Sequence, residues 1–443
     1  MSQLNSTPNR TFREVPKTGV IFVMSEATKR GFRYGDPEWA NLGQGAPETG
    51  QLPDSPSRVE SVTISVQQHE YSPVGGVIEL RAAVAELYNR RYRRGMKSQY
   101  GPENVAIASG GRLSLSRLAA ALGRTHLGHF LPDYTAYEEL LEIFERFNPI
   151  PIPLDPDRGY VCSPAELERE IVHRGLGAVL LSNPANPTGK LIGGGQLEGY
   201  VRVARALDSF LLFDEFYSHY IWDGAASPYG SVSSAAYVED VNRDPVVILD
   251  GLTKNWRYPG WRIGWTIGPK SVIDAVSSVG SFLDGGASHP LQLAALDLLQ
   301  FEHAEAEAKA IRKHFMGKRE LMLRRLMAMG IRVDIAPAGA FYVWGCVDNL
   351  PKGLNDGKSF FLRALDQKVI TVPGVFFDVN PGQRRFSRQS RFANYLRFSF
   401  GPEIEQLRLG LDRLEEMVKS AHESPVEPMD RAGDNIWGHI PLE

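Results

Sequence analysis

The stretch VVILDGLTKNWRYPGWRIGW, from Val246 to Trp265, joins a short apolar run to a single lysine and, eight residues later, an arginine. The apolar run is typical of a buried strand, so Lys254 is expected just past a strand end. Arg262 follows a Pro-Gly turn and stands among aromatic and glycine residues. The lysine is therefore either a solvated cation, one half of a structural salt bridge, or a nucleophile.

Four similar apolar runs precede this stretch, separated by segments long enough for helices. They read VAIAS, GHFLP, AVLLS and FLLFDE, within the region from Val105 to Lys254. Short apolar strands that alternate with helices are typical of a mainly parallel sheet covered by helices. Ligands of such sheets bind beyond the carboxyl ends of the strands. The residues expected at those ends are polar: Ser109 to Arg112, Tyr134, Asn186, Asp214 and Lys254.

The region before the sheet is expected to contribute little core. The first forty or so residues are polar and interrupted by Pro and Gly, which favours an arm. An amphipathic helix is predicted from Val77 to about Arg94, because Leu80, Val84 and Leu87 share one helical face.

A second unit is expected after the sheet. A charged helical segment from about His303 to Gly330 could run from one domain into the next. Strands are predicted in GIRVDIAPAGAFYVWG, KVITVPG and YLRFSFG, and a final helix from Pro402 to Ser420. The predicted class is α/β, with a mainly parallel sheet in a large domain plus a smaller α+β domain. We expect residues 1–70 to form an arm and part of the small domain, residues 71–320 the large domain, and residues 321–443 the C-terminal small domain.

Composition narrows the function classes. A chain of 443 residues favours two domains, and a formal charge of -3 offers no field that would attract nucleic acid or an anionic membrane. The two cysteines, Cys162 and Cys346, argue against a disulfide framework and a thiolate metal site. No apolar run approaches the ~20 residues that span a bilayer, and the N-terminus lacks a secretory apolar core. We expect a cytoplasmic protein that acts on small molecules and uses no metal.

Each polar motif has a structural explanation when taken alone. SGGR, ending at Arg112, is either a simple turn or a helix start whose N–H groups hold a phosphate. PDY, ending at Tyr134, can be explained as a turn whose tyrosine ring packs against the protein. NPANPTGK is more distinctive, because its prolines would rigidify a loop that holds Asn186 at a strand end. Asp214 is either a strand end or a buried anion that needs a partner, and a salt bridge with Lys254 would satisfy it.

The combination of motifs is more specific than its parts. In chain order the sequence has Gly45, Tyr71 with Gly76, SGGR, PDY, NPANPTG, DEFY, a lysine with an arginine eight residues on, and YLRFSFG. In this set and order it resembles the class I/II aminotransferases, pyridoxal-phosphate enzymes of the aspartate-aminotransferase fold, fold type I. The resemblance extends from about Leu42 to Phe400. It implies the transfer of an amino group between an L-amino acid and a 2-oxo acid in a ping-pong cycle.

The resemblance also implies roles around the cofactor ring. Lys254 would form the Schiff base with pyridoxal phosphate and shuttle a proton during catalysis. Asp214 would pair with the protonated ring nitrogen, while Asn186 and Tyr217 would hydrogen-bond the phenolic oxygen. Tyr134 would stack on one face of the ring.

Further implied roles concern the phosphate. Backbone N–H groups of Gly111 and Arg112 would hold it, Arg262 would clamp it, and Thr253 would lie beside it. Tyr71 matches a tyrosine that reaches the phosphate of a neighbouring subunit, which implies a homodimer with shared sites.

Substrate binding is implied for three residues. Arg397 would grip the α-carboxylate, with Gly45 and Asn186 beside it. Arg262 and Arg397 have an alternative interpretation as surface cations, which their apolar neighbours in the sequence disfavour. The basic run RRFSRQSRF is most simply a solvated loop, or else an entrance for an acidic substrate.

Three features depart from the family pattern. Phe216 stands where a small or aliphatic residue is usual, and we expect it to shift the cofactor or sandwich it. Gly251 replaces a serine that commonly contacts the phosphate, so that contact is expected to be lost. The segment from Phe376 to Asn394 is longer than expected. None of these removes a residue that amino transfer needs.

Two alternatives remain open at this level. The same lysine, aspartate and arginine would serve an elimination or cyclisation lyase or an amino acid oxidase of the same fold. A non-catalytic ligand sensor is the other alternative, although no basic helix-turn-helix segment is evident. Aromatic residues near the motifs favour an aromatic or apolar substrate, or else serve only the cofactor: Tyr134, Phe216, Tyr217, Trp256 and Tyr258.

Overall fold

The structure is a computed structural model that describes residues 19–222, 230–385 and 390–423. Its larger lobe contains a seven-stranded sheet in the order β2-β8-β7-β6-β5-β3-β4. The strands are β2 (Val105–Ala108), β3 (His126–Leu131), β4 (Asn148–Pro153), β5 (Leu176–Ser182), β6 (Phe210–Asp214), β7 (Val246–Gly251) and β8 (Gly264–Ile267). Only β8 runs antiparallel to its neighbours. The predicted α/β class with a mainly parallel sheet is therefore confirmed.

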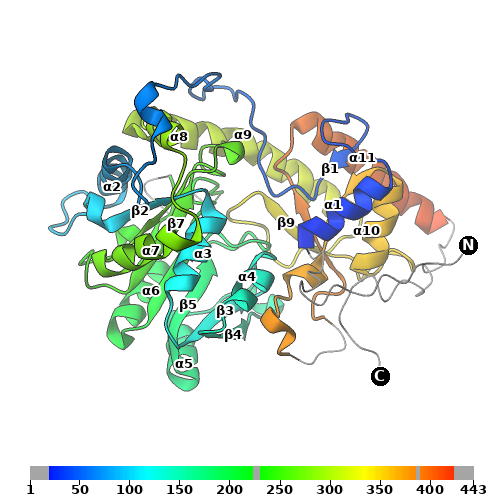
Figure 1. The fold of residues 1–443 in the computed structure, drawn as a ribbon. Coiled ribbons are helices and arrows are strands. Elements are labelled where there is room, and N and C mark those ends of the chain that lie inside the picture. Colours follow the sequence, from blue (N-terminus) through cyan, green and yellow to red (C-terminus); the bar gives the residue numbers. More distant parts are fainter. Residues whose placement is uncertain (1–18, 223–229, 386–389, 424–443) are drawn as a thin grey trace, which may run out of the picture.

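Helices cover both faces of this sheet, as Figure 1 shows. In β5, Ala178 and Leu180 face one way and Val179 and Leu181 the other, and all four are buried in two separate clusters. This alternation explains why the strands read as continuous apolar runs. The first cluster includes helices α3 (Gly111–Ala121) and α7 (Lys270–Leu283), and the second α2 (Ile78–Tyr92), α5 (Pro164–Arg174) and α6 (Gly194–Leu207). Two short helices, α4 (Tyr137–Ile143) and α8 (His289–Ala294), complete this lobe.

The smaller lobe is built from distant parts of the chain. The long helix α9 (Phe301–Ala328) runs from the large lobe toward it, as predicted for the charged segment (Figure 1). A three-stranded antiparallel sheet has the order β11 (Val372–Pro373), β12 (Tyr395–Ser399), β9 (Tyr342–Cys346), and β1 (Ala40–Asn41) pairs in parallel with β10 (Val369–Ile370). Helices α1 (Gly19–Lys29), α10 (Gly357–Asp366) and α11 (Ile404–Glu423) pack around these strands.

The predicted N-terminal arm is wrong for its described part. Residues 19–29 form α1, and Phe22, Val23 and Ala27 are buried in the main core. The ring of Phe22 contacts Phe361 and Phe376, with centroids 6.4 and 5.5 Å apart. The polar flanks concealed this apolar stripe, whose burial supplies the helix with most of its stability. Residues 1–18 lie outside the described part.

Two predicted strands of the small lobe are shorter than expected. In GIRVDIAPAGAFYVWG only β9 is a strand, and Arg332 meets Cys346 through an isolated bridge. The intervening residues include Pro337, which cannot donate to a ladder, and Gly339, which weakens one. KVITVPG divides into β10 and β11, which pair with different partners. The final helix is confirmed, with Leu407, Leu411 and Leu414 buried.

Candidate active site

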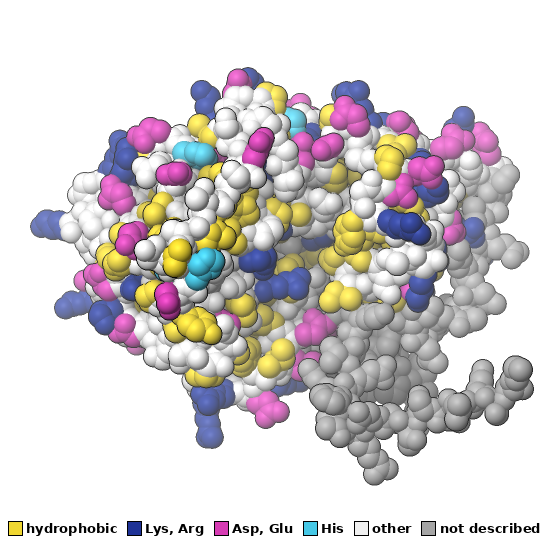
Figure 2. Space-filling model, turned by 45° about the horizontal axis from the view of Figure 1, so that its top comes forward, with side chains coloured by type: hydrophobic (Ala, Val, Ile, Leu, Met, Phe, Trp, Pro, Cys, Tyr) yellow, Lys and Arg dark blue, Asp and Glu magenta, His cyan; other side chains and the backbone are white. Residues whose placement is uncertain are grey.

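The two lobes meet at the carboxyl ends of the parallel strands, where the predicted site residues gather. Figure 2 shows Lys and Arg side chains among hydrophobic ones in the hollow between the lobes. The sheet register places Ser182 opposite Asp214, and Asp214 opposite Leu249, so β6 and β7 end at one level. Lys254 follows β7 directly, as the sequence predicts.

Lys254 has an unusual electrostatic setting. Its partly buried amine donates a hydrogen bond to the carbonyl oxygen of Gly45. Burial, followed by the positive charges of Arg397, Arg112 and Arg262, lowers the pKa of this lysine to about 7, against the opposing effect of Asp214. At neutral pH a large share of the amine is unprotonated, which is the form that acts as a nucleophile or base.

Asp214 does not pair with Lys254. Among the described residues, the ion pairs do not include one between these two side chains, so the salt-bridge interpretation is wrong. The carboxylate instead accepts a hydrogen bond of 2.8 Å from the hydroxyl of Tyr137 on α4. Burial raises the pKa of Asp214, because the Tyr137 hydroxyl and a long bond of 3.5 Å from the Phe216 N–H do not replace the water that a carboxylate loses. A cationic ligand group would find its counter-ion here.

A second part of the site lies at the N-terminus of α3. The first N–H groups of a helix have no carbonyl partner within it and can hold an anion. Arg262 follows the 3-10 turn Pro259–Trp261 in a left-handed conformation, with φ of 55°, and its guanidinium lies over Gly110. A Cβ on Gly110 would lie 2.5 Å from Arg262 Nη2. The turn thus returns Arg262 to the start of the helix that holds Gly111 and Arg112.

The hydroxyl of Thr253, the residue before Lys254, is another polar group of the site. Its Oγ1 is buried and has no hydrogen-bond partner among the described residues. Arg112, on the first turn of α3, donates to the hydroxyl of Tyr134 at 3.4 Å. An anion at the start of α3 would supply the acceptor that the threonine lacks.

Phe216 and the glycines around it interlock. A Cβ on Gly111 would lie 2.3 Å from the Phe216 ring, and one on Gly251 would lie 3.1 Å from the same ring. The Gly251 position is also closed by backbone, since its Cβ would stand 2.6 Å from Gly264 Cα and from Ile263 O. The two sequence departures are therefore neighbours in the packing: the Phe216 ring fills the space beside Gly111, and the close approach of β8 fills most of the space beside Gly251.

This packing predicts two different outcomes for added side chains. Gly111→Ala and Gly251→Ser are each expected to lower the free energy of unfolding by about 1–3 kcal/mol, because both overpack a closed space. Gly260→Ser is the matched control, since nothing lies within 4 Å of a Cβ there. Adding Phe216→Ala should relieve the Gly111→Ala defect, which arises from the ring, but not the Gly251→Ser defect, which arises from backbone. Urea denaturation of the single and double variants measures this, and equal relief of both would contradict it.

Arg397 occupies the side of the site that faces the small lobe. It lies on β12, is 1% exposed, and donates to Asn186 Oδ1 and to the carbonyl of Gly43, each at 2.9 Å. Its Nε has no partner, and within residues 19–222, 230–385 and 390–423 it forms no ion pair with a carboxylate. The guanidinium packs against the ring of Tyr342 at 4.2 Å and that of Phe377 at 5.2 Å. The surface-cation interpretation of Arg397 is therefore wrong, and a buried cation without an anion suits a carboxylate ligand.

Tyr217 contacts residues on the arginine side of the site. Its hydroxyl is 2.9 Å from that of Tyr342 and accepts from Asn186 Nδ2 at 3.5 Å. Asn186 also contacts Arg397, and Arg397 packs on the ring of Tyr342. The side chains of Tyr217, Tyr342, Asn186 and Arg397 therefore form a closed group.

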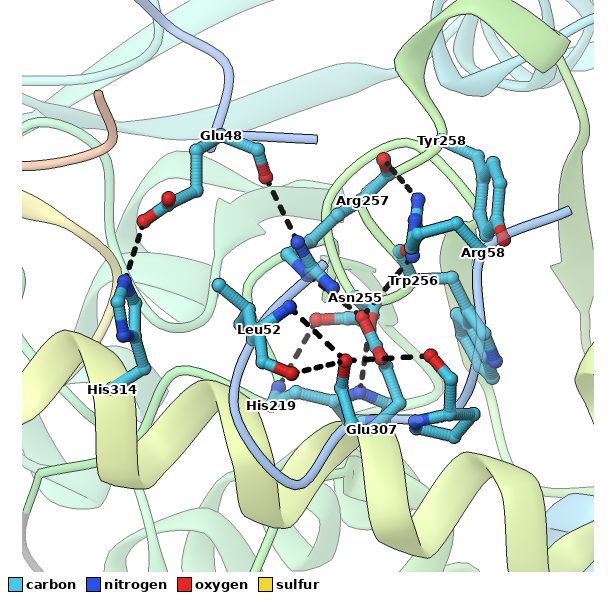
Figure 3. Close-up of polar contacts among 12 residues, drawn as sticks. Glu48, Leu52, Arg58, His219, Asn255, Trp256, Arg257, Tyr258, Glu307 and His314 are labelled. Carbon is cyan, nitrogen blue, oxygen red and sulfur yellow. Dashed lines mark hydrogen bonds and ion pairs between the residues drawn. The ribbon is translucent and has the colours of Figure 1, made fainter. Parts of the chain in front are cut away.

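The turn that carries Lys254 is anchored by a buried charge network, drawn in Figure 3. Arg257 adopts a left-handed conformation with φ of 60°, which is uncommon for a residue with a side chain. Its fully buried guanidinium pairs with Glu307 of α9 at 2.7 Å and donates to the carbonyls of Glu48 and Gly50. Arg58 donates to the carbonyl of Arg257 at 2.9 Å. The segment that supplies Gly45 is thereby fixed to the lysine turn and to α9.

Most of the predicted site residues therefore lie together in the hollow between the lobes, and Tyr71 is the exception. Tyr71 is 96% exposed and forms no hydrogen bond with the group around Lys254 in the described part of the chain. Sequence reasoning missed Tyr137, which is the partner of Asp214, and Tyr342, which is the partner of Tyr217. Tyr137 begins α4 three residues after Tyr134, a short spacing that gave a usable signal. Tyr342 was indistinguishable from a strand core residue.

The extended segment after Phe376 packs on α4. The backbone N–H of Asn380 donates to Glu138, and Arg385 pairs with Asp378 at 2.8 Å. Residues 386–389, in the basic run, lie outside the described part. In the described part of the chain no helix is long and apolar enough to cross a bilayer. Nor do any of those residues form a group of three or more His, Cys, Asp or Glu able to hold a metal ion. Both cysteines are free and buried.

Comparisons with known proteins agree with the geometry. An aspartate/prephenate aminotransferase of Thermus thermophilus is 28% identical over 374 residues, covering 83% of this chain and 89% of the relative. An aromatic-amino-acid aminotransferase of Thermococcus litoralis is 26% identical, covering 79% and 84%. A solved structure of a double mutant of Thermus thermophilus aspartate aminotransferase superposes with a TM-score of 0.73 at 25% identity, covering 94% of this chain and all of that one.

The match to the family is extensive. An aminotransferase from Mycobacterium tuberculosis superposes with a TM-score of 0.72 at 25% identity, covering 90% of this chain and 96% of that one. The family model for aminotransferases of class I and II matches residues 37–414. The chain therefore belongs to the class I and II aminotransferases and is a pyridoxal-phosphate-dependent enzyme.

Proposed function

We propose that Lys254 is the residue to which the cofactor attaches and the base that moves the substrate proton. The observation that carries this is the amine itself, which donates to the carbonyl of Gly45 and has a pKa lowered to about 7 by burial and by the charges of three arginines. A single lysine in this position can both bond to the cofactor and, once displaced by substrate, take the proton from the substrate Cα. When bound, pyridoxal phosphate supplies an electron sink for the charge that remains at Cα.

The residues present fit the cofactor. The glycine turn at Gly110 and Gly111, the guanidinium of Arg262 and the unpartnered hydroxyl of Thr253 would hold the phosphate, together with the N–H of Arg112. The carboxylate of Asp214, held by Tyr137, would pair with the ring nitrogen. Three further side chains would contact the ring and its oxygen: Tyr134, Asn186 and Tyr217.

Substrate binding is assigned to the other side of the site. Arg397 would bind the α-carboxylate, because it is a buried cation with free donor capacity beside Gly45 and Asn186. The carboxylate would then orient the substrate so that its Cα–H bond faces Lys254. The substrates we propose are an L-amino acid and a 2-oxo acid that react in a ping-pong cycle.

A homodimer with shared sites is part of this proposal. Several exposed apolar side chains lie on the segment of Tyr71 or on segments that pack near it, where Gly286 approaches Val74 and Gly75 approaches Ser277. Exposed apolar patches of this kind mark protein interfaces. On a partner surface Tyr71 would be free to reach the phosphate of the second subunit. The exposed members are Ile64, Val66, Tyr71, Ile78 and Phe282.

The remaining assignments are also proposals. We propose that residues 71–320 form the cofactor-binding domain, that residues 321–443 with part of residues 1–70 form the small domain, and that the enzyme is cytoplasmic.

A half-reaction tests the proposed function. The enzyme loaded with pyridoxal phosphate is mixed with an amino acid and no acceptor, and a panel of donors is compared. Amino transfer predicts loss of the cofactor's visible band, release of one equivalent of 2-oxo acid per subunit, and return of the band when a second 2-oxo acid is added. Ammonia release or oxygen consumption without this reversible change would instead indicate a lyase or an oxidase, and an unchanged spectrum with every donor would favour a sensor.

A further inference from the structure

Tyr342 places a second phenol at the centre of the site. It lies on β9 and its side chain is fully buried. Its hydroxyl oxygen is 2.9 Å from that of Tyr217, and the two rings meet edge to face with centroids 5.6 Å apart. A Cβ on Gly45 would lie 3.7 Å from the same hydroxyl, so Tyr342 reaches the residue whose carbonyl contacts Lys254.

The ring of Tyr342 makes a different contact from its hydroxyl. The guanidinium carbon of Arg397 lies 4.2 Å from the ring centroid, which is a close cation–π contact. Tyr342 therefore contacts the arginine through its ring and Tyr217 through its oxygen. Substitutions can separate these two contacts, because phenylalanine removes only the second.

The direction of the hydrogen bond follows from counting protons. A tyrosine hydroxyl has one proton to donate and two lone pairs that accept. If Tyr217 donates its proton to the phenolic oxygen of the cofactor, it must accept from Tyr342. Burial raises the pKa of Tyr342 to about 12, so its proton is present at neutral pH. A hydroxyl that accepts a hydrogen bond becomes a stronger donor, because successive bonds polarise one another.

We propose that Tyr342 is a positioning residue that donates to Tyr217, strengthening the hydrogen bond from Tyr217 to the cofactor, while its ring holds Arg397 in place. This inference rests on the proposed function. A stronger hydrogen bond to the phenolic oxygen withdraws negative charge from the neighbourhood of the lysine nitrogen. With the cofactor bound, the Lys254 nitrogen would then lose its proton at a lower pH than it otherwise would.

The experiment is a spectroscopic pH titration of the cofactor-loaded protein, which does not depend on turnover. Tyr342→Phe is expected to raise the pH midpoint of the visible band by about half a unit. A shift of this size corresponds to a fraction of the free energy of one hydrogen bond. Tyr217→Phe should raise it further, and the double variant no further than Tyr217→Phe alone, since Tyr342 acts through Tyr217. Tyr200→Phe is the control, because that buried tyrosine donates to the carbonyl of Cys162 and should leave the midpoint unchanged.

Binding of an unreactive dicarboxylate tests the contact with Arg397. Tyr342→Phe keeps the ring and should retain the wild-type dissociation constant, whereas Tyr342→Leu should raise it several-fold. Melting temperatures of all variants separate these effects from a general loss of stability.

Distinct outcomes would overturn this inference. An unchanged midpoint in Tyr342→Phe, or shifts that add in the double variant, would exclude action through Tyr217. Weaker dicarboxylate binding in Tyr342→Phe with an unchanged midpoint would show that the hydroxyl contacts the substrate instead. Failure of the wild-type protein to bind pyridoxal phosphate would contradict the proposed function rather than the role of Tyr342.

Discussion

Lys254→Ala is expected to lower kcat by roughly 10⁴-fold, the upper range for removal of a catalytic acid–base group. The variant loses both the residue to which the cofactor attaches and the base that we propose removes the proton from the substrate Cα. It should still fold, because its amine makes one hydrogen bond, to Gly45, and the turn that carries it is anchored separately through Arg257 and Glu307. Steady-state kinetics, together with the mass of the protein after borohydride reduction, measures both losses.

Lys190→Ala is the matched control for this experiment. Lys190 is also a partly buried lysine whose pKa is lowered by burial, but it lies outside the group around Arg397 and Asp214. It should keep near wild-type turnover and bound cofactor. A Lys254→Ala protein that retained more than about a tenth of kcat would contradict the assignment of base and attachment to this residue.

The lowered pKa of Lys254 predicts how the rate of cofactor attachment at this residue depends on pH. Only the neutral amine attacks a carbonyl carbon, and a pKa of about 7 means that the neutral form predominates above that pH. The rate at which cofactor-free protein attaches pyridoxal phosphate should therefore rise with pH through about 7 and level off above it. Stopped-flow absorbance measures the rate, and a rate that still rose steadily between pH 8 and 10 would indicate an unperturbed lysine.

The sequence predicts the larger lobe well because its information is local. A parallel strand buried on both faces is apolar at nearly every position, and the runs from Ala178 to Leu181 in β5 and from Val246 to Leu249 in β7 show this directly. The polar residue that ends each run then falls at the binding edge, which is why Asp214, Asn186 and Lys254 could be placed together before any contact was known. Arg262 could be joined to Lys254 because the turn that connects them is short.

The contacts that give the site its chemistry are not local. Tyr342 meets Tyr217 across 125 positions of sequence, and Arg257 meets Glu307 across 50. A buried charge pair leaves no pattern in either segment, because each partner alone reads as an ordinary surface residue. The same limit explains why the sequence suggested a salt bridge between Asp214 and Lys254, whose actual partners lie on α4 and at Gly45.

Gly251 stands where the family commonly has a serine, and only the packing of the structure explains this difference. The sequence shows that the serine is missing, but the reason lies in the approach of β8. The backbone of Gly264 lies where a serine side chain at position 251 would be. Because Phe216 fills the neighbouring space, the residues that we propose for the phosphate are Arg262, Thr253 and those at the start of α3. In this proposal the departure changes which residues contact the anion and leaves the residues assigned to amino transfer in place.

Arg397→Gln is expected to lower kcat/KM for an amino acid by about 10²- to 10³-fold, since truncating one partner of a buried charge pair costs about 2–5 kcal/mol. The effect arises because the guanidinium, 1% exposed and without a carboxylate among the described residues, is proposed to receive its anion from the substrate. Arg397→Lys should recover only part of the loss, because an ammonium cannot keep the bonds to Asn186 and Gly43 while binding a carboxylate in the same plane.

An amine that lacks the α-carboxylate is the internal control for Arg397. The wild-type enzyme should prefer an amino acid to the corresponding decarboxylated amine by a large ratio of kcat/KM, and Arg397→Gln should lose most of that preference. A variant that lost activity toward both compounds equally would show that Arg397 maintains the structure of the site. If instead the ratio collapses while the amine reacts as before, the cation held between Tyr342 and Asn186 acts on the carboxylate, and it orients the Cα–H bond toward Lys254.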